Sequence, residues 1–410
     1  MAISERFATS SLRIRGSGNR QKRELAKRGI GRSYRKIQSV ASPSDIVVVG
    51  AGVVGCAVAY ELARRGAAVQ IVDDRVPGKG ATQASAGVLA PFIEARDGGP
   101  LLELTARSLT LFDTFISQLV EDGETMAYQR TGTLDVAMQG QSLRQLSSTA
   151  ALLAARGIEA EVLDAAATRR HEPELSEDVI GGLLITTHGF VRATELTRSL
   201  AAAARRRGAR FVEPARVHTI AAAGSGLTVR TTDGVLSADW VVLAAGSWAG
   251  QVHVEGASNR IPVKPIRGQL LELGWVGPRL RRVLWGERCY MVPWTDGTVL
   301  VGATVEDAGF DERTTVAGVH DLIQAACDLV PRTWTATLTE VRAGLRPGTP
   351  DGIPIIGPSA ALPNLMYATG HFRSGVLLSA LTAQLVANAI LDRVADPLLL
   401  FTDPQRFGDV

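Results

Sequence analysis

The sequence predicts an α/β protein in which a doubly wound parallel sheet is combined with a second domain built on an antiparallel sheet. An uninterrupted run rich in β-branched residues over 45–50 is typical of a strand buried on both faces. A helix predicted over 53–65 and a second strand over 68–73 complete a βαβ unit. Short strands then indicate an antiparallel sheet, at about 261–273, 289–294 and 298–303.

The other predicted elements indicate that the chain leaves the first domain and later returns to it. A hairpin around Asp233-Gly234 runs into an apolar strand ending near 246. A last strand and helix, over 365–370 and 374–391, repeat the pattern of the opening unit. Amphipathic helices are predicted at about 101–121, 143–155 and 194–207. We therefore predict a first domain made of 44–95, 185–250 and 340–400, a second made of 96–184 and 251–339, and a basic, disordered extension at 1–43.

The composition predicts a soluble chain of one or two domains. Its 410 residues are 46% apolar and include 42 glycines, which suits an α/β enzyme rich in turns. The longest apolar run, 376–391, is interrupted by Ser379, Thr382, Gln384 and Asn388, so no membrane span is predicted. The three cysteines form no CxxC pair, so neither a disulfide framework nor a metal site is expected. A reducing, cytoplasmic location fits best.

The positive charge is confined to the N-terminal segment. Residues 1–40 hold eleven Lys or Arg against two Glu, whereas the rest holds 33 basic against 39 acidic residues. The segment is Arg- and Ser-rich without an apolar stretch, which leaves open a misassigned extension, a transit peptide or a binding arm. Because the remainder of the chain is net negative, a nucleic-acid-binding function is disfavoured.

A glycine fingerprint lies between the first predicted strand and helix. Gly50, Gly52 and Gly55 fit the pattern GxGxxG. The first glycine permits a tight turn, the second lets the backbone approach a pyrophosphate, and the third lets helix pack on strand. Asp73 ends the second strand, where a carboxylate can accept hydrogen bonds from ribose hydroxyls and would repel a 2′-phosphate. The pattern predicts a dinucleotide site and leaves FAD and NAD open.

A second run of small residues, 80–89, suits a backbone that lies against a long cofactor. With Asp73-Asp74 and four later motifs, it resembles the D-amino acid oxidase superfamily of FAD-dependent oxidoreductases, most of all the glycine oxidases of thiamine biosynthesis. The later motifs lie at 245–248, 344–352, 354–357 and 368–378. The resemblance extends over about 45–395. It implies that the first domain is a Rossmann-like FAD-binding domain of the glutathione-reductase type and that the second holds the substrate.

The resemblance implies oxidative deamination of glycine, and of sarcosine or small D-amino acids, to glyoxylate, ammonia and hydrogen peroxide. The intermediate imine would feed thiamine thiazole biosynthesis. The alternative is a D-amino acid or secondary amino acid dehydrogenase that passes electrons to a quinone. Implied partners are a small amino acid and molecular oxygen, without nucleic acid or membrane, and a homo-oligomer is left open. Family members with covalent flavin use a cysteine near the ring system, and no cysteine follows Cys327, so FAD is expected to be non-covalent.

Three residues are predicted to act on the substrate. The guanidinium of Arg346, between glycines and Pro347, can clamp an α-carboxylate through two parallel hydrogen bonds, the role the resemblance gives it. Tyr290 matches a family tyrosine that lines the substrate pocket. Arg373 precedes the terminal helix, whose N-terminal amides would stabilise negative charge on the reduced flavin, and the resemblance places its side chain at the substrate or flavin edge.

The resemblance also yields a set of expected FAD-binding residues. His371 has no carboxylate partner nearby in the sequence and is interpreted as structural or flavin-adjacent, not as a general base. Two departures from related glycine oxidases, Val88 for methionine and Arg288 for histidine, are expected to reshape the pocket mouth. The full set is Gly50, Gly52, Val53, Val54, Gly55, Asp73, Asp74, Ala81, Thr82, Ala86, Gly87, Val88, Val191, Gly246, His371, Phe372, Arg373, Ser374, Gly375, Val376 and Leu377.

Overall fold

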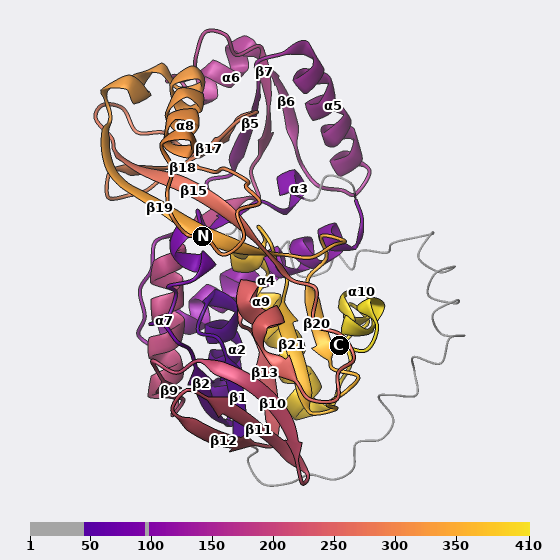
Figure 1. Cartoon of the computed structure of the whole chain (residues 1–410). Helices are drawn as coiled ribbons and strands as arrows, with labels where there is room; N and C mark the ends of the chain where they lie inside the picture. Colours follow the sequence, from indigo (N-terminus) through magenta and orange to yellow (C-terminus); the bar gives the residue numbers. More distant parts are fainter. Residues whose placement is uncertain (1–44, 95–97) are drawn as a thin grey trace. The chain divides into compact units, whose positions relative to one another are not determined.

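The structure, a computed structural model, describes residues 45–94 and 98–410. The prediction of a disordered extension at 1–43 lies outside the described residues. The described residues form four sheets, of which the six-stranded and eight-stranded ones carry most of the fold. Figure 1 shows the eight-stranded sheet above the six-stranded one.

The six-stranded sheet is the predicted parallel sheet. Its central strands are continuous apolar runs, as expected for strands covered on both faces. All neighbouring pairs are parallel except the edge pair of β20 and β21. In spatial order the strands are β20 (Ile355–Pro358), β21 (Leu365–Thr369), β13 (Trp240–Leu243), β1 (Asp45–Val49), β2 (Ala68–Val72) and β9 (Arg210–Val212).

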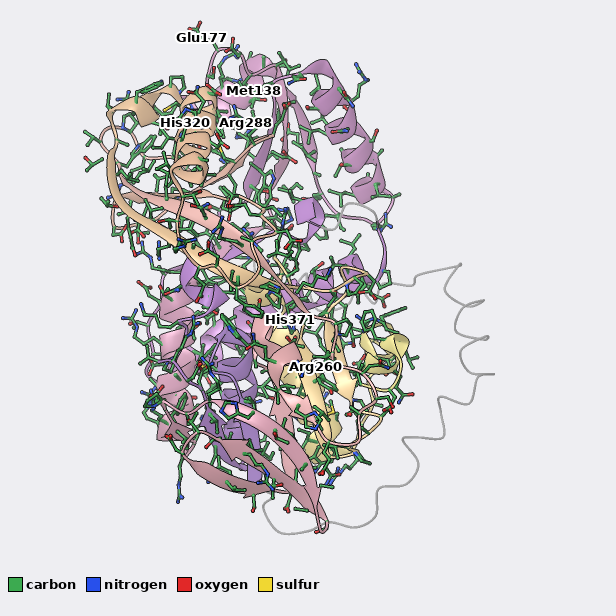
Figure 2. The ribbon with its side chains drawn as sticks, viewed as in Figure 1. Met138, Glu177, Arg260, Arg288, His320 and His371 are labelled. Carbon is green, nitrogen blue, oxygen red and sulfur yellow. The ribbon has the colours of Figure 1, made fainter. Side chains whose placement is uncertain are left out.

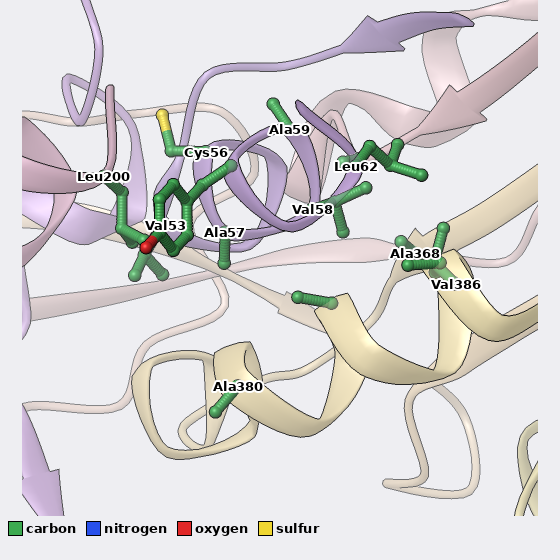
Figure 3. Packing of buried hydrophobic residues seen from close by; sticks show 14 of the residues in the cluster. Val53, Cys56, Ala57, Val58, Ala59, Leu62, Leu200, Ala368, Ala380 and Val386 are labelled. Carbon is green, nitrogen blue, oxygen red and sulfur yellow. The ribbon is translucent and has the colours of Figure 1, made fainter. Parts of the chain in front are cut away.

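Helices cover one face of this sheet. The largest apolar cluster joins the sheet to α2 (Val53–Arg64), α4 (Pro100–Glu121), α7 (Ala193–Arg206) and α9 (Gly375–Ala387). Helices α2 and α9 pack against each other, and Figure 3 shows Ala57 of α2 on the side that faces α9. This packing fixes the N-terminal ends of both helices relative to the sheet, which matters for the site described below.

The other face of the parallel sheet is covered by strands. Here β10 (Val217–Ala223), β11 (Gly226–Thr231), β12 (Gly234–Ala238) and β14 (His253–Val254) form a four-stranded sheet. Leu227 and Val229 are buried while Arg230 is exposed, an alternation that gives a sheet one apolar face. The expected fold class is confirmed. One difference is that the second face of the parallel sheet is covered by this four-stranded sheet and not by a second layer of helices.

The eight-stranded sheet is antiparallel except between β16 and β5. Its spatial order is β19 (Thr337–Gly348), β15 (Lys264–Gly274), β18 (Thr298–Gly302), β17 (Tyr290–Pro293), β16 (Val283–Trp285), β5 (Thr133–Ala137), β7 (Gly181–Ile185) and β6 (Glu161–Asp164). Helices α5 (Gly140–Ala154), α6 (Ala165–His171) and α8 (Val316–Leu329) pack against it. The smaller elements are α3 (Pro91–Glu94), α10 (Leu399–Thr402) and the three-stranded sheet of β3 (Val88–Leu89), β8 (Gly189–Val191) and β4 (Tyr128–Gln129).

Two elements modify the predicted division into domains, which itself remains a proposal. Helix α4, predicted in the second domain, packs against α9, and its Ser108 hydroxyl donates a hydrogen bond to the Leu377 carbonyl at 2.5 Å. Strand β19 pairs with β15 from Thr337 to Gly348, across the predicted boundary at 340. We propose that α4 belongs with the parallel sheet and that β19 belongs with the eight-stranded sheet.

The helix that begins at Gly375 and continues to Asp392 is long and apolar enough, by length and composition, to cross a membrane. Two thirds of it (67%) is buried inside the fold, where it packs against α2 and α4. Its apolar character on all sides is therefore accounted for by burial in a protein core.

His188, between β7 and β8, is a fully buried histidine. Its Nε2 accepts the Phe92 N–H at 3.4 Å, so Nδ1 carries the proton and donates to the Thr133 hydroxyl at 2.8 Å. Burial, with a smaller contribution from Arg130, lowers the pKa of His188 to about 3. The folded protein therefore holds this ring neutral at pH values where the unfolded chain protonates it.

We expect this histidine to make folding stability depend on pH. The pKa of His188 is lower in the folded state, so its contribution is present above the unfolded pKa of about 6.5 and is lost as pH falls toward the folded value. His188→Asn should therefore reduce the slope of the free energy of unfolding against pH, between pH 6 and pH 4, by about 1.4 kcal/mol per pH unit relative to the parent. Denaturant titrations at several pH values measure this slope. His320→Asn, at an exposed histidine, should keep the parent slope; equal slopes for all three proteins would contradict the assignment.

Candidate active site

A cavity of about 550 Å³ lies where the parallel sheet meets the eight-stranded sheet. It is lined by residues that follow the carboxyl ends of β1, β2 and β13, including Gly50, Asp73 and Ala245. The carboxyl edge of a parallel sheet is where such folds bind their ligands. The first residues of α2 and α9 also line it, so two helix N-termini contribute amides and positive dipole ends.

The three fingerprint glycines have different physical requirements. Gly50 has φ +106°, and a Cβ there would lie 2.5 Å from the Ala244 carbonyl oxygen. A Cβ on Gly55 would lie only 1.9 Å from the Gly50 carbonyl oxygen, so this glycine permits the strand-to-helix contact. Gly52 lines the cavity, and the nearest atom to a Cβ there is the Thr82 hydroxyl at 3.7 Å. The first and third glycines therefore serve the fold, whereas the second keeps a cavity wall clear for a ligand.

Two acidic residues follow β2. The Asp73 carboxylate accepts backbone N–H bonds from Ala51 at 2.6 Å and Arg75 at 2.8 Å, which fixes it beside the fingerprint turn. Burial raises the pKa of Asp73, and these two hydrogen bonds partly offset that effect. Asp74 pairs with Arg216 at 2.6 Å. The carboxylates and the cavity they line fit the ribose end of a dinucleotide.

The small-residue run forms a second wall of the cavity. Ala81–Ala84 form a 3₁₀ turn whose Thr82 hydroxyl accepts the Val53 N–H at 3.1 Å. Gly87 has φ +64°, and a Cβ there would lie 1.7 Å from the Val191 carbonyl oxygen. Val191 is itself buried and donates its N–H to Gly87 at 2.9 Å. It supports this wall from behind and is not among the described residues that line the cavity.

The segment before α9 forms the third wall. Phe372 has φ 48° and donates its N–H to the Pro347 carbonyl, which joins this turn to the end of β19. His371 is buried, and its Nε2 lies 3.0 Å from the Thr382 hydroxyl. Burial lowers the pKa of His371 to about 4, so the ring is neutral at pH 7. Arg373 is exposed and lines the cavity.

Arg346 and Tyr290 extend into the cavity from different strands of the eight-stranded sheet. The Arg346 guanidinium lies over Gly268 of β15, where a Cβ would come within 2.2 Å of Nη1. Nη1 donates to the Thr304 carbonyl at 2.9 Å and more weakly to the Arg267 carbonyl at 3.4 Å. The Tyr290 ring lies over Gly302 in the same way, with its hydroxyl 2.3 Å from where a Cβ would stand. Two glycines thus make room for the two side chains.

The two positions that depart from the family pattern both line the cavity. Arg288 is exposed and pairs with Asp328 at 3.0 Å; Figure 2 labels it in the part of the chain that carries the eight-stranded sheet, and His371 near the start of α9. Val88 begins β3. Cys289, which was not predicted from the sequence as a site residue, also lines the cavity. Burial raises the pKa of Cys289 to about 12, so it is a protonated thiol and a poor nucleophile.

Most residues predicted from the sequence meet in this cavity. Of the predicted set, Gly55, Val191, Ser374 and Leu377 are not among the described residues that line it, because they pack behind its walls. Sequence reasoning missed the segment Ala215–Val217, which lines the cavity and is tied to β2 by a 2.8 Å hydrogen bond from Ala215 N–H to the Asp73 carbonyl. It also missed Ala303 and Val305. None of these positions lies in a sequence motif, since the pairing of nearby strands and the hydrogen bond to Asp73 place them.

The fingerprint turn, the two acidic residues after β2 and a cavity that is also lined by Arg346 and Tyr290 are the features of a dinucleotide-dependent oxidoreductase. Residues 45–389 match the family described as FAD dependent oxidoreductase, abbreviated DAO. The chain belongs to this family, and its cofactor is FAD.

The relatives include proteins of several named activities. The chain is 36% identical over 362 residues to the bifunctional protein ThiO/ThiG of Nostoc sp., covering 87% of this chain and 54% of that protein. It therefore spans about half the length of the bifunctional relatives. It is 31% identical to the hydrogen cyanide synthase subunit HcnC of Pseudomonas aeruginosa, with 83% and 91% covered. The crystal structure of glycine oxidase from Geobacillus kaustophilus superposes with a TM-score of 0.85 at 32% identity, covering 88% of this chain and 98% of that one.

Proposed function

We propose that this protein oxidises glycine to glyoxylate and ammonia, with reduction of molecular oxygen to hydrogen peroxide. Sarcosine and small D-amino acids are further proposed substrates. The observation that carries the proposal is Arg346, whose guanidinium is held by two backbone carbonyls in the wall of the FAD cavity. The similarity to glycine oxidases supports the same assignment.

Arg346 is proposed to bind the substrate carboxylate. A guanidinium presents planar donors that match a carboxylate, and a charge-assisted bidentate pair fixes orientation as well as position. The carbonyls of Thr304 and Arg267 hold Nη1, so the plane of the guanidinium is set before substrate binds. Tyr290 and Arg373 line the same cavity and are proposed to contact the substrate beside Arg346.

FAD, when bound, supplies the acceptor for the hydride that leaves the substrate Cα. Residues at the fingerprint, at 80–88 and at the start of α9 would hold it. The N-terminus of α9, with Gly375 and Val376 at the cavity wall, favours negative charge there. His371 is neutral at pH 7 and buried, so it does not compete with Arg346 for the carboxylate. Orientation and an uncharged substrate amine are sufficient, and no general base is assigned.

The flavin is proposed to be non-covalent, because the cysteine that lines the cavity is a protonated thiol. Further proposals are a cytoplasmic location, without nucleic-acid or membrane partners, and use of the imine product in thiamine thiazole formation. The proposed partners in the reaction are a small amino acid and molecular oxygen.

A substrate panel tests the proposal and separates it from a quinone-linked dehydrogenase. With glycine, sarcosine, D-alanine and D-proline in air, we expect peroxide to form in equal amount to the oxo-acid product, fastest with glycine or sarcosine. Adding a quinone analogue should give little extra turnover. Substrate turnover that requires the quinone and yields no peroxide would identify the dehydrogenase, and no turnover of any of the four would overturn the proposal.

A further inference from the structure

A polar network lies behind Arg346 and outside the cavity lining. It is centred on Glu306, which follows β18 and forms an antiparallel bridge with Arg267 of β15. The backbone bonds of this bridge are Arg267 N–H to the Glu306 carbonyl at 2.8 Å and Glu306 N–H to the Arg267 carbonyl at 3.0 Å. This bridge holds residues 304–306 against β15 at the level of Arg346.

The Glu306 side chain gathers donors from three residues. Its Oε1 accepts from the Thr304 hydroxyl at 2.5 Å and from Gln269 Nε2 at 2.7 Å. Its Oε2 accepts from Arg267 Nη2 at 2.5 Å and Nε at 3.1 Å. Arg267 and Gln269 are buried. Burial tends to raise the pKa of Glu306, but the hydrogen bonds from Thr304, Gln269 and Arg267 outweigh it and lower the pKa, so the group is a carboxylate near neutral pH.

The network reaches Arg346 through Thr304 and Arg267. The Thr304 hydroxyl is held on one side by Glu306 and accepts the Gln269 N–H at 2.9 Å on the other. The carbonyl of the same residue accepts from Arg346 Nη1 at 2.9 Å. The second acceptor of Nη1 is the Arg267 carbonyl, which also accepts the Glu306 N–H. Two contacts that hold the guanidinium, to the Thr304 and Arg267 carbonyls, therefore come from residues whose side chains bind Glu306.

We propose that Glu306 is a positioning residue that sets the orientation of Arg346 for the substrate carboxylate. The inference rests on the proposed function, since it assigns Arg346 a carboxylate. Replacing Glu306 by Gln keeps the shape but puts an NH₂ group where donors converge, so some of the four hydrogen bonds must be lost. The buried Arg267 then keeps only Asp311, at 3.1 Å, as a carboxylate partner. The Thr304 hydroxyl loses its carboxylate acceptor, which loosens the Thr304 carbonyl that Arg346 Nη1 contacts.

The test is carboxylate binding by the FAD-loaded enzyme. Acetate, which has the carboxylate and lacks the amine, should bind the parent and change the flavin absorption spectrum. In Glu306→Gln we expect the acetate Kd and the glycine KM to rise together by about 10-fold, in line with the loss of a charge-assisted hydrogen bond. The rate of flavin reduction at saturating glycine should change by less than about 3-fold, because FAD contacts are kept.

Glu312→Gln is the matched control. Glu312 lies on the same loop, is as exposed as Glu306 and pairs with Arg75 at 2.9 Å, without contact to Thr304. It should leave acetate Kd and glycine KM at the parent values. Thr304→Val is a second variant, which removes the hydroxyl link and keeps the carbonyl, and should raise both constants in the same direction.

The outcomes separate the two hypotheses. Failure of acetate to bind the parent would count against the proposed function itself. Normal acetate binding in flavin-loaded Glu306→Gln, or a loss of kcat without a change in KM, would overturn the positioning role. If Glu306→Gln does not fold with FAD, Thr304→Val decides, and unchanged constants in that variant would reject the proposal.

Discussion

Arg346→Ala is expected to lower kcat/KM for glycine by about 10- to 200-fold, with flavin content unchanged. A charge-assisted hydrogen-bonded pair contributes roughly 1.5–3 kcal/mol, and each 1.4 kcal/mol corresponds to about a tenfold change. Arg346→Lys should recover only part of the loss, because an ammonium supplies charge without the planar fork that orients a carboxylate. Steady-state kinetics with peroxide detection measure both variants.

Methylamine is the control substrate for this prediction, since it keeps the amine and lacks the carboxylate. It should be a poor substrate for the parent and should lose much less on the Arg346→Ala change. Equal losses for glycine and methylamine would mean that Arg346 acts on the reaction in some other way than by binding the carboxylate.

Gly55→Ala is expected to abolish FAD binding. Its Cβ would lie 1.9 Å from the Gly50 carbonyl oxygen, so the turn between β1 and α2 must open. Gly52→Ala provides the contrast, because the nearest described atom to a Cβ there, apart from the neighbouring residues in the chain, is the Thr82 hydroxyl oxygen at 3.7 Å, and φ of −71° suits alanine. Without FAD, this variant should have a Tm near that of the parent apoprotein. It should nevertheless bind FAD at least about 10-fold more weakly than the parent, because the added methyl group occupies cavity space.

The measurement for both glycine variants is flavin released into the supernatant after acid denaturation, beside a thermal melt of the apoprotein. Release from the parent also tests the non-covalent attachment. Full flavin content in Gly52→Ala would show that the pyrophosphate does not approach this glycine. Full flavin content in Gly55→Ala would contradict the contact as described.

The parts of the fold that could be predicted are those with a local signal. Helix α2 starts at Val53 as predicted, because the glycine turn and the apolar run mark its start in the sequence. It could not be predicted that the four-stranded sheet covers the second face of the parallel sheet, since alternating apolar residues in a hairpin do not indicate which surface the hairpin packs against. Helix α4 was predicted as a helix, but its packing against α9 depends on contacts between residues more than 250 positions apart.

The same distinction holds for the candidate site. Gly52, Asp73 and Arg346 lie in motifs with a chemical reason for each residue type, and the structure places all three at the cavity. Thr304 and the segment Ala215–Val217 carry no such pattern; they reach the site through the pairing of distant strands and through one backbone bond to Asp73. Val191 was expected at the cofactor, but its carbonyl lies behind Gly87.

We propose that this FAD enzyme takes electrons from a small amino acid whose carboxylate is bound by Arg346. Anaerobic mixing of the purified, flavin-loaded protein with glycine tests it most directly. We expect loss of the oxidised flavin absorbance with glycine at a rate that saturates with concentration, and little loss with an equal concentration of methylamine. A flavin that stays oxidised with glycine, sarcosine and D-alanine alike, or that is reduced equally fast by methylamine, would contradict it.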